Sequence, residues 1–446
     1  MEFAMPMLIG NIAQQLYNTA DSVIVGRYVG DNALAAVGSA GPILNLLLAL
    51  FVGISTGAGI VISQSYGARD REGLSENIGN CISLAAVASV VIMIVGPLLT
   101  TPLLQLLRTP ESIIAWCTDY LNIYFYGIIG FFFYNMLSGV LRGLGDSLSA
   151  LVFLLIAAAL NVVLDLWFVA GFGMGVPGVA LATIIAQAIS AVLCYLKLIR
   201  MRDVFDLNWK TIRLKKNRAV KILQIGIPSG ITQAIMSMAM MVVQSLTNSM
   251  GEMVIAANVI IMRVDGFAMM PNFTFGQTMS VYAGQNVGAG KLDRVTKGCK
   301  QGSLIALLIA GVITMVLVLF GHYLFAIFTT TEALVALATR MIRIMAVGYL
   351  CMAVTQVLGG VMRGAGDTVT PMWISIITTI VIRVPVAYAL AWLTRSEQWI
   401  NGAPEALSAS LLISWTLGML MSVVVYRMGK WKKKMIASAE AHGHKI

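Results

Sequence analysis

The sequence reads LSGVLRGLGD at residues 137–146 and LGGVMRGAGD at residues 358–367, two near-copies that lie 221 residues apart. Two further pairs of segments keep the same offset of 221 residues: QSYGA at 64–68 with QNVGA at 285–289, and GD at 30–31 with GE at 251–252. One constant offset across three separated stretches indicates that the second half of the chain repeats the first.

The composition around this repeat is that of a membrane protein. Of the 446 residues, 58% are hydrophobic and 11% are charged, and the mean hydropathy is +0.85. A soluble domain averages about 25% charged residues, so this chain cannot cover itself with a water-facing surface. The apolar stretches are long and continuous, which excludes the short alternating strands of a β-barrel. The five cysteines stand singly, without CxxC spacing, and predict neither a disulfide framework nor a metal site.

Twelve stretches are apolar over the length of about 20 residues that a transmembrane helix needs. They are predicted at 4–27, 34–62, 79–104, 113–141, 148–171, 177–199, 222–250, 254–282, 301–326, 334–362, 368–393 and 406–427. We therefore predict an all-α membrane protein of two parallel six-helix repeats, with an N-lobe at 1–199, a basic linker at 200–221 and a C-lobe at 222–446. Secondary transporters are commonly built from such repeats and bind substrates between the halves.

Basic residues set the predicted orientation. The linker carries eight Lys and Arg, and cytoplasmic loops are enriched in these residues. Alternating outward from the linker places both termini in the cytoplasm and only Arg27, Arg108 and Arg395 outside. This split accounts for the net charge of +10 without a nucleic-acid partner. The basic tail, 432–434, is expected to be solvated beside lipid headgroups.

The repeated RGxGD segments are predicted on the cytoplasmic side, after the fourth and tenth spans. Gly143 and Gly364 suit the backbone of a tight turn. Asp146 and Asp367 suit caps of the helices that follow. The alternative is that these segments form a gate that opens and closes. Pro6 lies within the first predicted span, where a proline is expected to kink or loosen the helix.

Two aspartates of the first lobe are predicted at bilayer depth, where a charge is costly and marks a functional hypothesis. Asp21 shares one helix face with Gln14 and Tyr17, and Asp165 shares another with Asn161. Because no basic residue lies at comparable depth in this lobe, the two carboxyl groups suit a carrier that binds protons. The same oxygens suit a monovalent cation such as Na⁺ equally well. Hydrogen bonding between helices is the simpler interpretation, but it explains buried amides better than two aspartates.

The second lobe carries a different set of polar and methionine side chains. Gln233 and Met236 lie on the seventh predicted span, and Met262 and Asp265 lie on the eighth. Methionine adapts to varied apolar shapes, so these residues are predicted to line a substrate cavity. Helix packing is the alternative for each methionine taken singly.

The residues also carry a family resemblance. The stretch FAMPMLIGNIAQQLYNTADSVIVGRYVG at 3–30, the pair SQSYGAR and GQNVGAG, and the two RGxGD segments resemble the MATE (multidrug and toxic compound extrusion) family, within a flippase-like superfamily. The likeness is to the prokaryotic branch that has its cation site in the first lobe. It implies a coupling site at the following positions: Asp21, fifteen residues after Pro6, then Asn161, Asp165 and Thr183. Three more positions match polar residues of the same cavity: Tyr17, beside the coupling site, and Gln14 and Asn135.

The resemblance implies a monomeric antiporter of the inner membrane. Protons or Na⁺ enter down their gradient while a drug-like, amphipathic and often cationic compound leaves, and no cofactor or catalytic residue is expected. The first alternative is a flippase for lipid-linked precursors, in which Arg263, Arg343 and Arg383 would face a pyrophosphate. The second is a membrane enzyme, but His322 has no metal-ligand spacing around it. No ATPase motif is present, because Gln285 and Leu292 break the Walker-like GAGK segment.

Overall fold

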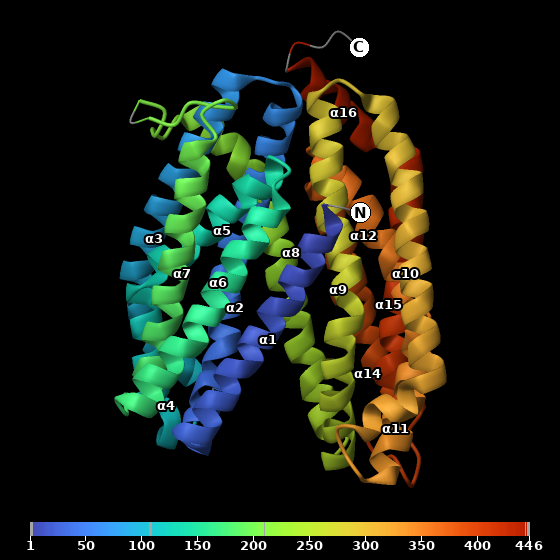
Figure 1. The fold of residues 1–446 in the computed structure, drawn as a ribbon. Helices are drawn as coiled ribbons and strands as arrows, with labels where there is room; N and C mark the ends of the chain where they lie inside the picture. The colour runs from blue at the N-terminus through green and yellow to red at the C-terminus, as the bar shows by residue number, and fades with distance from the viewer. Residues whose placement is uncertain (1–2, 107–108, 209, 442, 444–446) are drawn as a thin grey trace. The chain divides into compact units, whose positions relative to one another are not determined.

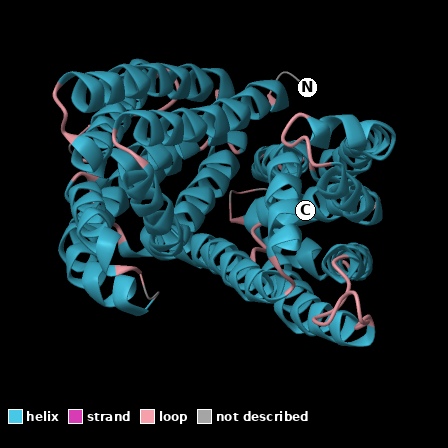
Figure 2. Cartoon of the chain, turned by 90° about the horizontal axis from the view of Figure 1, so that it is seen from below, coloured by secondary structure: helices cyan, strands magenta, loops and turns pink. Residues whose placement is uncertain are grey.

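The computed structural model describes residues 3–106, 109–208, 210–441 and 443. These residues form helices, turns and short loops, with no strand among them (Figure 2). Contacts divide the chain into two compact units, Met1–Gly230 and Ile231–Ile446. Arg108, which we predicted on the outer side, lies outside the described residues.

Most of the helices are labelled in Figure 1. Those of the first unit are α1 (Ala4–Tyr28), α2 (Asp31–Gly67), α3 (Arg71–Leu106), α4 (Glu111–Tyr126), α5 (Ile128–Gly143), α6 (Ser147–Asp165), the π-helix η1 (Leu166–Gly171) and α7 (Gly175–Arg200). The helix α8 (Lys216–Ser249) begins in the first unit and ends in the second. The second unit continues with α9 (Glu252–Gly288), α10 (Leu292–Ala326), α11 (Glu332–Ala346), α12 (Gly348–Gly364), α13 (Val369–Ile376), the π-helix η2 (Ile377–Arg383), α14 (Val384–Leu393), α15 (Glu405–Met428) and α16 (Lys430–Glu440).

The described helices confirm an all-helical protein with many spans. Nine are long and apolar enough to cross a membrane, and two bent pairs raise the number to 11. The predicted span at 4–27 corresponds to α1, which is 25 residues long but falls outside this set. Apolar side chains also remain uncovered along one face of α10, at helical spacing and each about 60% exposed: Leu304, Leu308, Val312, Met315 and Leu319. A face of this kind is expected to contact lipid.

Two predicted spans, 113–141 and 334–362, are bent rather than straight. Helices α4 and α5 meet at 54°, and α11 and α12 meet at 43°. The bends fall at Gly127 and near Gly348, which occupy the same position in the two repeats. At each of them another helix packs where a side chain would stand: Ile184 lies against Gly127 and Trp415 against Gly348. The missing side chain therefore lets a neighbouring helix enter the bend.

The repeat is also visible in the backbone. Gly30 and Gly251 have φ angles of 114° and 102°, and each caps the helix that follows. Gly145 and Gly366 have φ angles of 92° and 90° within the two RGxGD segments. These conformations strongly favour glycine, so the two halves use the same turn chemistry at the same positions.

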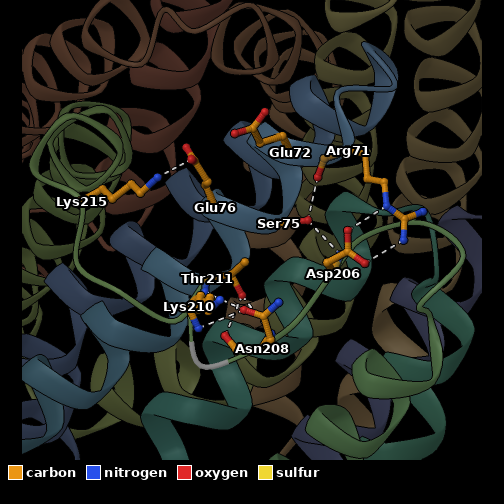
Figure 3. A pocket seen from close by; sticks show the side chains of 9 residues that line it. All are labelled: Arg71, Glu72, Ser75, Glu76, Asp206, Asn208, Lys210, Thr211 and Lys215. Carbon is orange, nitrogen blue, oxygen red and sulfur yellow. Dashed lines mark hydrogen bonds and ion pairs between the residues drawn. The ribbon is translucent and has the colours of Figure 1, made fainter.

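The polar linker is attached to the first unit. Arg71 at the start of α3 holds Asp206 through two hydrogen bonds of 2.9 Å, and it also donates to the backbone carbonyls of Asp203 and Arg202. Lys215 forms an ion pair with Glu76 on α3. Figure 3 shows the Arg71–Asp206 and Lys215–Glu76 contacts around a pocket of about 400 Å³ between the linker and α3.

The first half of α8 packs against α2 through four glycines. A Cβ atom on Gly57 would lie 2.6 Å from Cα of Gly226, and one on Gly230 would lie 2.7 Å from Cα of Leu50. Gly53 likewise faces the backbone of Gly230. The physical boundary between the units therefore falls at Gly230 inside α8, whereas the sequence placed it at the linker, 200–221.

The C-terminal helix α16 is docked on the second unit. Trp431, Met435 and Ala439 are no more than 4% exposed, and they join the apolar cluster formed with α9 and α12. Lys434 forms an ion pair of 2.8 Å with Asp367. The basic tail is therefore more than a solvated segment: its lysines alternate with a buried apolar face.

Candidate functional site

The candidate coupling site lies inside the first unit, where α6 packs against both α1 and α7. Asn161 and Asp165 are one helical turn apart on α6 and are fully buried. Asp21 comes from α1 and is partly buried, and Thr183 comes from α7 and is 7% exposed. The structure thus brings together the four residues that the sequence placed in one site.

The Asn161 amide links the two carboxyl groups. With its nitrogen toward them, it donates to Oδ1 of Asp21 at 2.6 Å and to Oδ2 of Asp165 at 3.1 Å. This orientation is the favourable one, because carboxylate oxygens accept hydrogen bonds. The other end of the amide lies 3.3 Å from Oγ1 of Thr183, which donates to the backbone carbonyl of Val179.

The two carboxyl groups are also close enough to interact directly with each other. A hydrogen bond between two carboxyl groups requires that one of them carries a proton. The second oxygen of Asp165, Oδ1, is buried without a hydrogen-bond partner. Among the described residues, no ion pair joins a Lys or Arg to either aspartate. The pair therefore has an unfilled acceptor and no internal counter-charge, which suits binding of a proton or a small cation.

The backbone changes form directly at Asp165. Helix α6 ends there and continues as η1, a π-helix with a wider turn. The N–H of Leu166 is shared between the carbonyls of Val162 and Val163, so the regular ladder is interrupted beside the carboxyl group. π-Helical turns inside α-helices are often found at functional sites. Nothing in the spacing of apolar residues predicts this change.

Aromatic side chains surround the pair. Tyr17 is buried one turn before Asp21 and hydrogen-bonds to Thr183. Tyr120 and Tyr124 of α4 are buried and close enough to interact with the charge of Asp21. These two tyrosines were not predicted from the sequence, although their spacing of four residues on one helix face could have indicated them.

The two residues of the first unit that were predicted to line the cavity, Gln14 and Asn135, differ in their surroundings. Gln14 is partly buried on α1. Asn135 donates to the backbone carbonyl of Phe131 at 2.8 Å, one turn earlier on its own helix α5. Asn135 is therefore engaged within its helix rather than with the carboxyl pair.

The second unit separates the residues that the sequence grouped as a substrate cavity. Met236 lines an internal cavity of this unit, whereas Gln233 and Met262 are exposed. Asp265 accepts a hydrogen bond of 2.8 Å from the hydroxyl of Tyr349 and interacts with the charge of Arg383.

The arginines behind the flippase alternative do not share one environment. Arg263 and Arg343 are exposed, whereas Arg383 is partly buried beside Asp265. Charge compensation of Asp265 therefore comes from Arg383. No group of three or more His, Cys, Asp or Glu that could hold a metal ion occurs in the described parts of the chain.

The RGxGD segments form tight turns. Asp146 caps α6 by accepting from the N–H of Ser149 at 2.9 Å and from its hydroxyl at 2.7 Å, and Lys197 lies 3.4 Å away. Partial burial alone would raise the pKa of Asp146, but these donors outweigh it and lower the pKa from its ordinary value. Asp367 accepts in the same way from Thr370.

The glycines predicted to form the turns instead allow close packing between helices. Gly143 and Gly364 are the last residues of α5 and α12, and they lie against the backbones of α2 and α9. The positive φ angles fall two residues later, at Gly145 and Gly366. Pro6 lies in the first turn of α1, where a proline removes no helical hydrogen bond, so the predicted kink at Pro6 is not formed.

Comparison with known families decides the classification. The MatE family matches residues 6–167 and again residues 228–389, which together make up most of the chain. The chain belongs to the MatE family. Because each half matches the family once, the internal repeat read from the sequence is confirmed. A MatE protein is a multi-pass membrane transporter and not an enzyme.

Relatives agree with this classification, and solved structures share the fold. The probable multidrug resistance protein YoeA of Bacillus subtilis is 30% identical over 445 residues, which cover 97% of this chain and 94% of the relative. The probable multidrug resistance protein NorM of Thermotoga maritima is 26% identical, with coverages of 99% and 94%. A crystal structure of MATE in the bent conformation has a TM-score of 0.88 at 24% identity, with coverages of 99% and 96%. An outward-facing multidrug resistance MATE family transporter of the MOP superfamily has a TM-score of 0.87 at 23% identity, again covering 99% and 96%.

Proposed function

We propose that this MatE protein is a multidrug antiporter of the cell membrane that couples the entry of protons or Na⁺ to the export of drug-like compounds. The names of its relatives, which are multidrug resistance proteins, support the drug-export part. The basic linker and tail support a cytoplasmic location for both termini. The coupling part rests on the carboxyl pair of the first unit.

The observation that carries the coupling is the buried contact of Asp21 with Asp165, joined by Asn161 and left without a basic partner. Two negative charges at this separation inside a protein repel strongly. A proton or a cation between them removes the repulsion and allows α1 and α6 to stay in contact. Loss of the ion favours their separation. The occupancy of the pair thereby biases the packing of α1 against α6.

A two-state packing of this kind is what an antiporter needs, because an ion can shift a conformational equilibrium only by binding one state better than the other. Alternating access then follows if one state is open to each side of the membrane. A membrane potential supplies about 2.3 kcal/mol per charge per 100 mV, which corresponds to roughly fifty-fold accumulation per coupled cation. Asp165 Oδ1, the buried acceptor without a partner, is the atom at which a bound proton or Na⁺ gains most.

Transport in proteoliposomes tests the proposal. Purified protein is reconstituted with a fluorescent cationic dye inside or outside, and a pH gradient and a Na⁺ gradient are imposed separately. Asp21→Asn keeps the shape and the hydrogen bonds but removes the titrating group, as does Asp165→Asn. Asp119→Asn is the matched control, because Asp119 lies exposed on α4 of the same unit.

Gradient-driven transport should be lost in Asp21→Asn and in Asp165→Asn, while dye binding at equilibrium is retained. The double variant should lose no more than either single one, because the two residues act as one unit. The Asp119→Asn protein should transport like the wild type. Robust gradient-driven transport by Asp21→Asn would overturn the assignment and point to Asp265, the partly buried carboxyl group on α9 of the second unit.

A further inference from the structure

The two repeats treat the arginine of the RGxGD segment differently. In the first unit, Arg142 donates to Oγ of Ser138 at 2.6 Å, one turn earlier on α5. The repeat places Arg363 at the same position on α12, but Gly359 stands where the first half has Ser138. Arg363 therefore lacks the hydroxyl group that accepts a hydrogen bond from Arg142 in the first repeat.

No other group replaces that hydroxyl within the described chain. Arg363 has neither a hydrogen bond nor an ion pair with any described residue, although the side chain is partly buried. Asp367, four residues later, is engaged by Thr370 and by Lys434. A Cβ on Gly359 would lie 3.3 Å from Nη1 of Arg363, so the guanidinium lies over the bare backbone of α12.

The guanidinium borders an internal cavity of the second unit. Its volume is about 100 Å³, which is room for one small polyatomic group. The hydroxyls of Ser375, Thr379 and Ser422 line it together with Arg363, and none of the three has a hydrogen-bond partner in the described chain. The described lining contains no Asp or Glu.

The remaining lining is mixed. Met352, Ile374 and Trp415 give it an apolar and aromatic part, and Trp415 is held against Tyr349 with ring centroids 5.7 Å apart. Further polar side chains also line the cavity: Thr232, Thr355, Gln356, Thr378 and Ser414. The cavity therefore offers one positive charge and several hydroxyl groups together with apolar and aromatic surface.

We propose that this cavity binds the oxyanion of a small amphipathic molecule, a carboxylate or a phosphate, with Arg363 as its anchor. A planar guanidinium matches both groups through paired hydrogen bonds. An unpaired charge that is partly withdrawn from water is costly, so a ligand that supplies the counter-charge gains free energy that the empty cavity lacks. Gly359 is part of the site because it leaves the guanidinium unengaged. The inference goes beyond the proposed function, and it depends on neither the coupling ion nor the export of drugs.

Binding of benzoate to the purified protein in phospholipid-free detergent tests the proposal, measured by calorimetry. Benzamide is the matched probe, because it has the same ring and shape without the charge. Arg363→Met removes the anchor. Gly359→Ser restores the partner found in the first repeat and keeps the charge, and its added atoms meet only the flexible end of Arg363 and Pro371.

Benzoate should bind the wild type at least about tenfold more tightly than benzamide, as expected for hydrogen bonds to a charged group. Both variants should lose about that factor for benzoate and change little for benzamide. Gly359→Ser carries the test if Arg363→Met does not fold. Equal binding of the two probes, or full benzoate affinity in Gly359→Ser, would overturn the proposal, as would the absence of benzoate binding.

A second arm identifies the source of the oxyanion. Phosphatidylglycerol is added to the wild-type protein with benzoate bound. Displacement of benzoate by the lipid would assign the cavity to a lipid headgroup phosphate. Retention of benzoate would assign it to a soluble carboxylate or phosphate. Because no gradient is imposed, these results stand apart from the transport test of the carboxyl pair.

Discussion

The glycine contact between α2 and α8 allows one substitution to be worked out quantitatively. In Gly57→Ala the new Cβ atom would lie 2.5 Å from N and 2.6 Å from Cα of Gly226. Ordinary carbon contacts are about 3.5–4 Å, so the two helices must separate by about 1 Å. Neither atom can rotate away, because both belong to the backbone. Overpacking of this kind costs about 1–3 kcal/mol.

The cost should appear as a lower melting temperature. For a folding unit of about this size, 1 kcal/mol shifts the melting temperature by about 2–4 °C, so Gly57→Ala should melt roughly 2–12 °C below the wild type. Gly38→Ala is the matched control, since Gly38 lies on the same helix with nothing within 4 Å of its Cβ position. It should melt like the wild type or slightly higher, because alanine favours the helix.

The assay is thermal unfolding of purified protein in detergent, followed by loss of the monodisperse peak in size-exclusion chromatography. Gly226→Ala should resemble Gly57→Ala, and the double variant should be less destabilised than the sum, since both act on one helix contact. The reasoning is refuted if Gly57→Ala melts with the wild type, or if Gly38→Ala falls by the same amount.

Three further outcomes are expected. Asp146→Asn should lower the melting temperature at pH 7. The difference in melting temperature between wild type and variant should close as the pH falls below about 3.9, because a carboxyl group with a lowered pKa stabilises the fold only while it is ionised. A difference in melting temperature that stays constant down to pH 3 would contradict this. Trp431→Ala should cost about 3–5 kcal/mol by opening a cavity, whereas Ile436→Ala, at an exposed site on the same helix, should cost clearly less. Equal losses of stability would argue against the docking of α16. Arg71→Ala should speed trypsin cleavage in the linker. High salt should raise the cleavage rate of the wild type toward that of the variant, since the Arg71–Asp206 ion pair is exposed. A wild-type cleavage rate that does not depend on salt would argue against this ion pair as the anchor of the linker.

Much of the fold could be predicted because hydropathy and repeats are properties of the chain itself. The constant offset identified two equivalent halves, and the apolar runs located the spans. Window hydropathy could not reveal the bends at Gly127 and Gly348, because each bend lies inside one continuous apolar run. The boundary between the two units could not be predicted from the sequence either. Composition marks the polar linker, whereas the division of the chain into units follows glycine packing around Gly226.

The candidate site was predictable where helical spacing determines which residues share one face. Asn161 and Asp165 are four residues apart, so they had to share a helix face. Asp21 and Asp165 stood out because both were predicted at bilayer depth with no basic residue at comparable depth in the same lobe. The π-helix after Asp165 and the freed guanidinium of Arg363 were not predictable. Both depend on what packs around them, and the exchange of Ser138 for Gly359 acquires meaning only once hydrogen-bond partners are known.

The docking of α16 has a genetic consequence. A nonsense mutation just after Met428 would leave every predicted span intact, yet it would uncover the apolar surface that receives Trp431 and Met435. It would also strip Lys434 from Asp367, whose side chain is only 4% exposed. A buried carboxylate that loses its cation is strongly destabilised. Late stop codons in this gene should therefore act as null alleles through failed folding and degradation, even though no membrane-crossing segment is deleted.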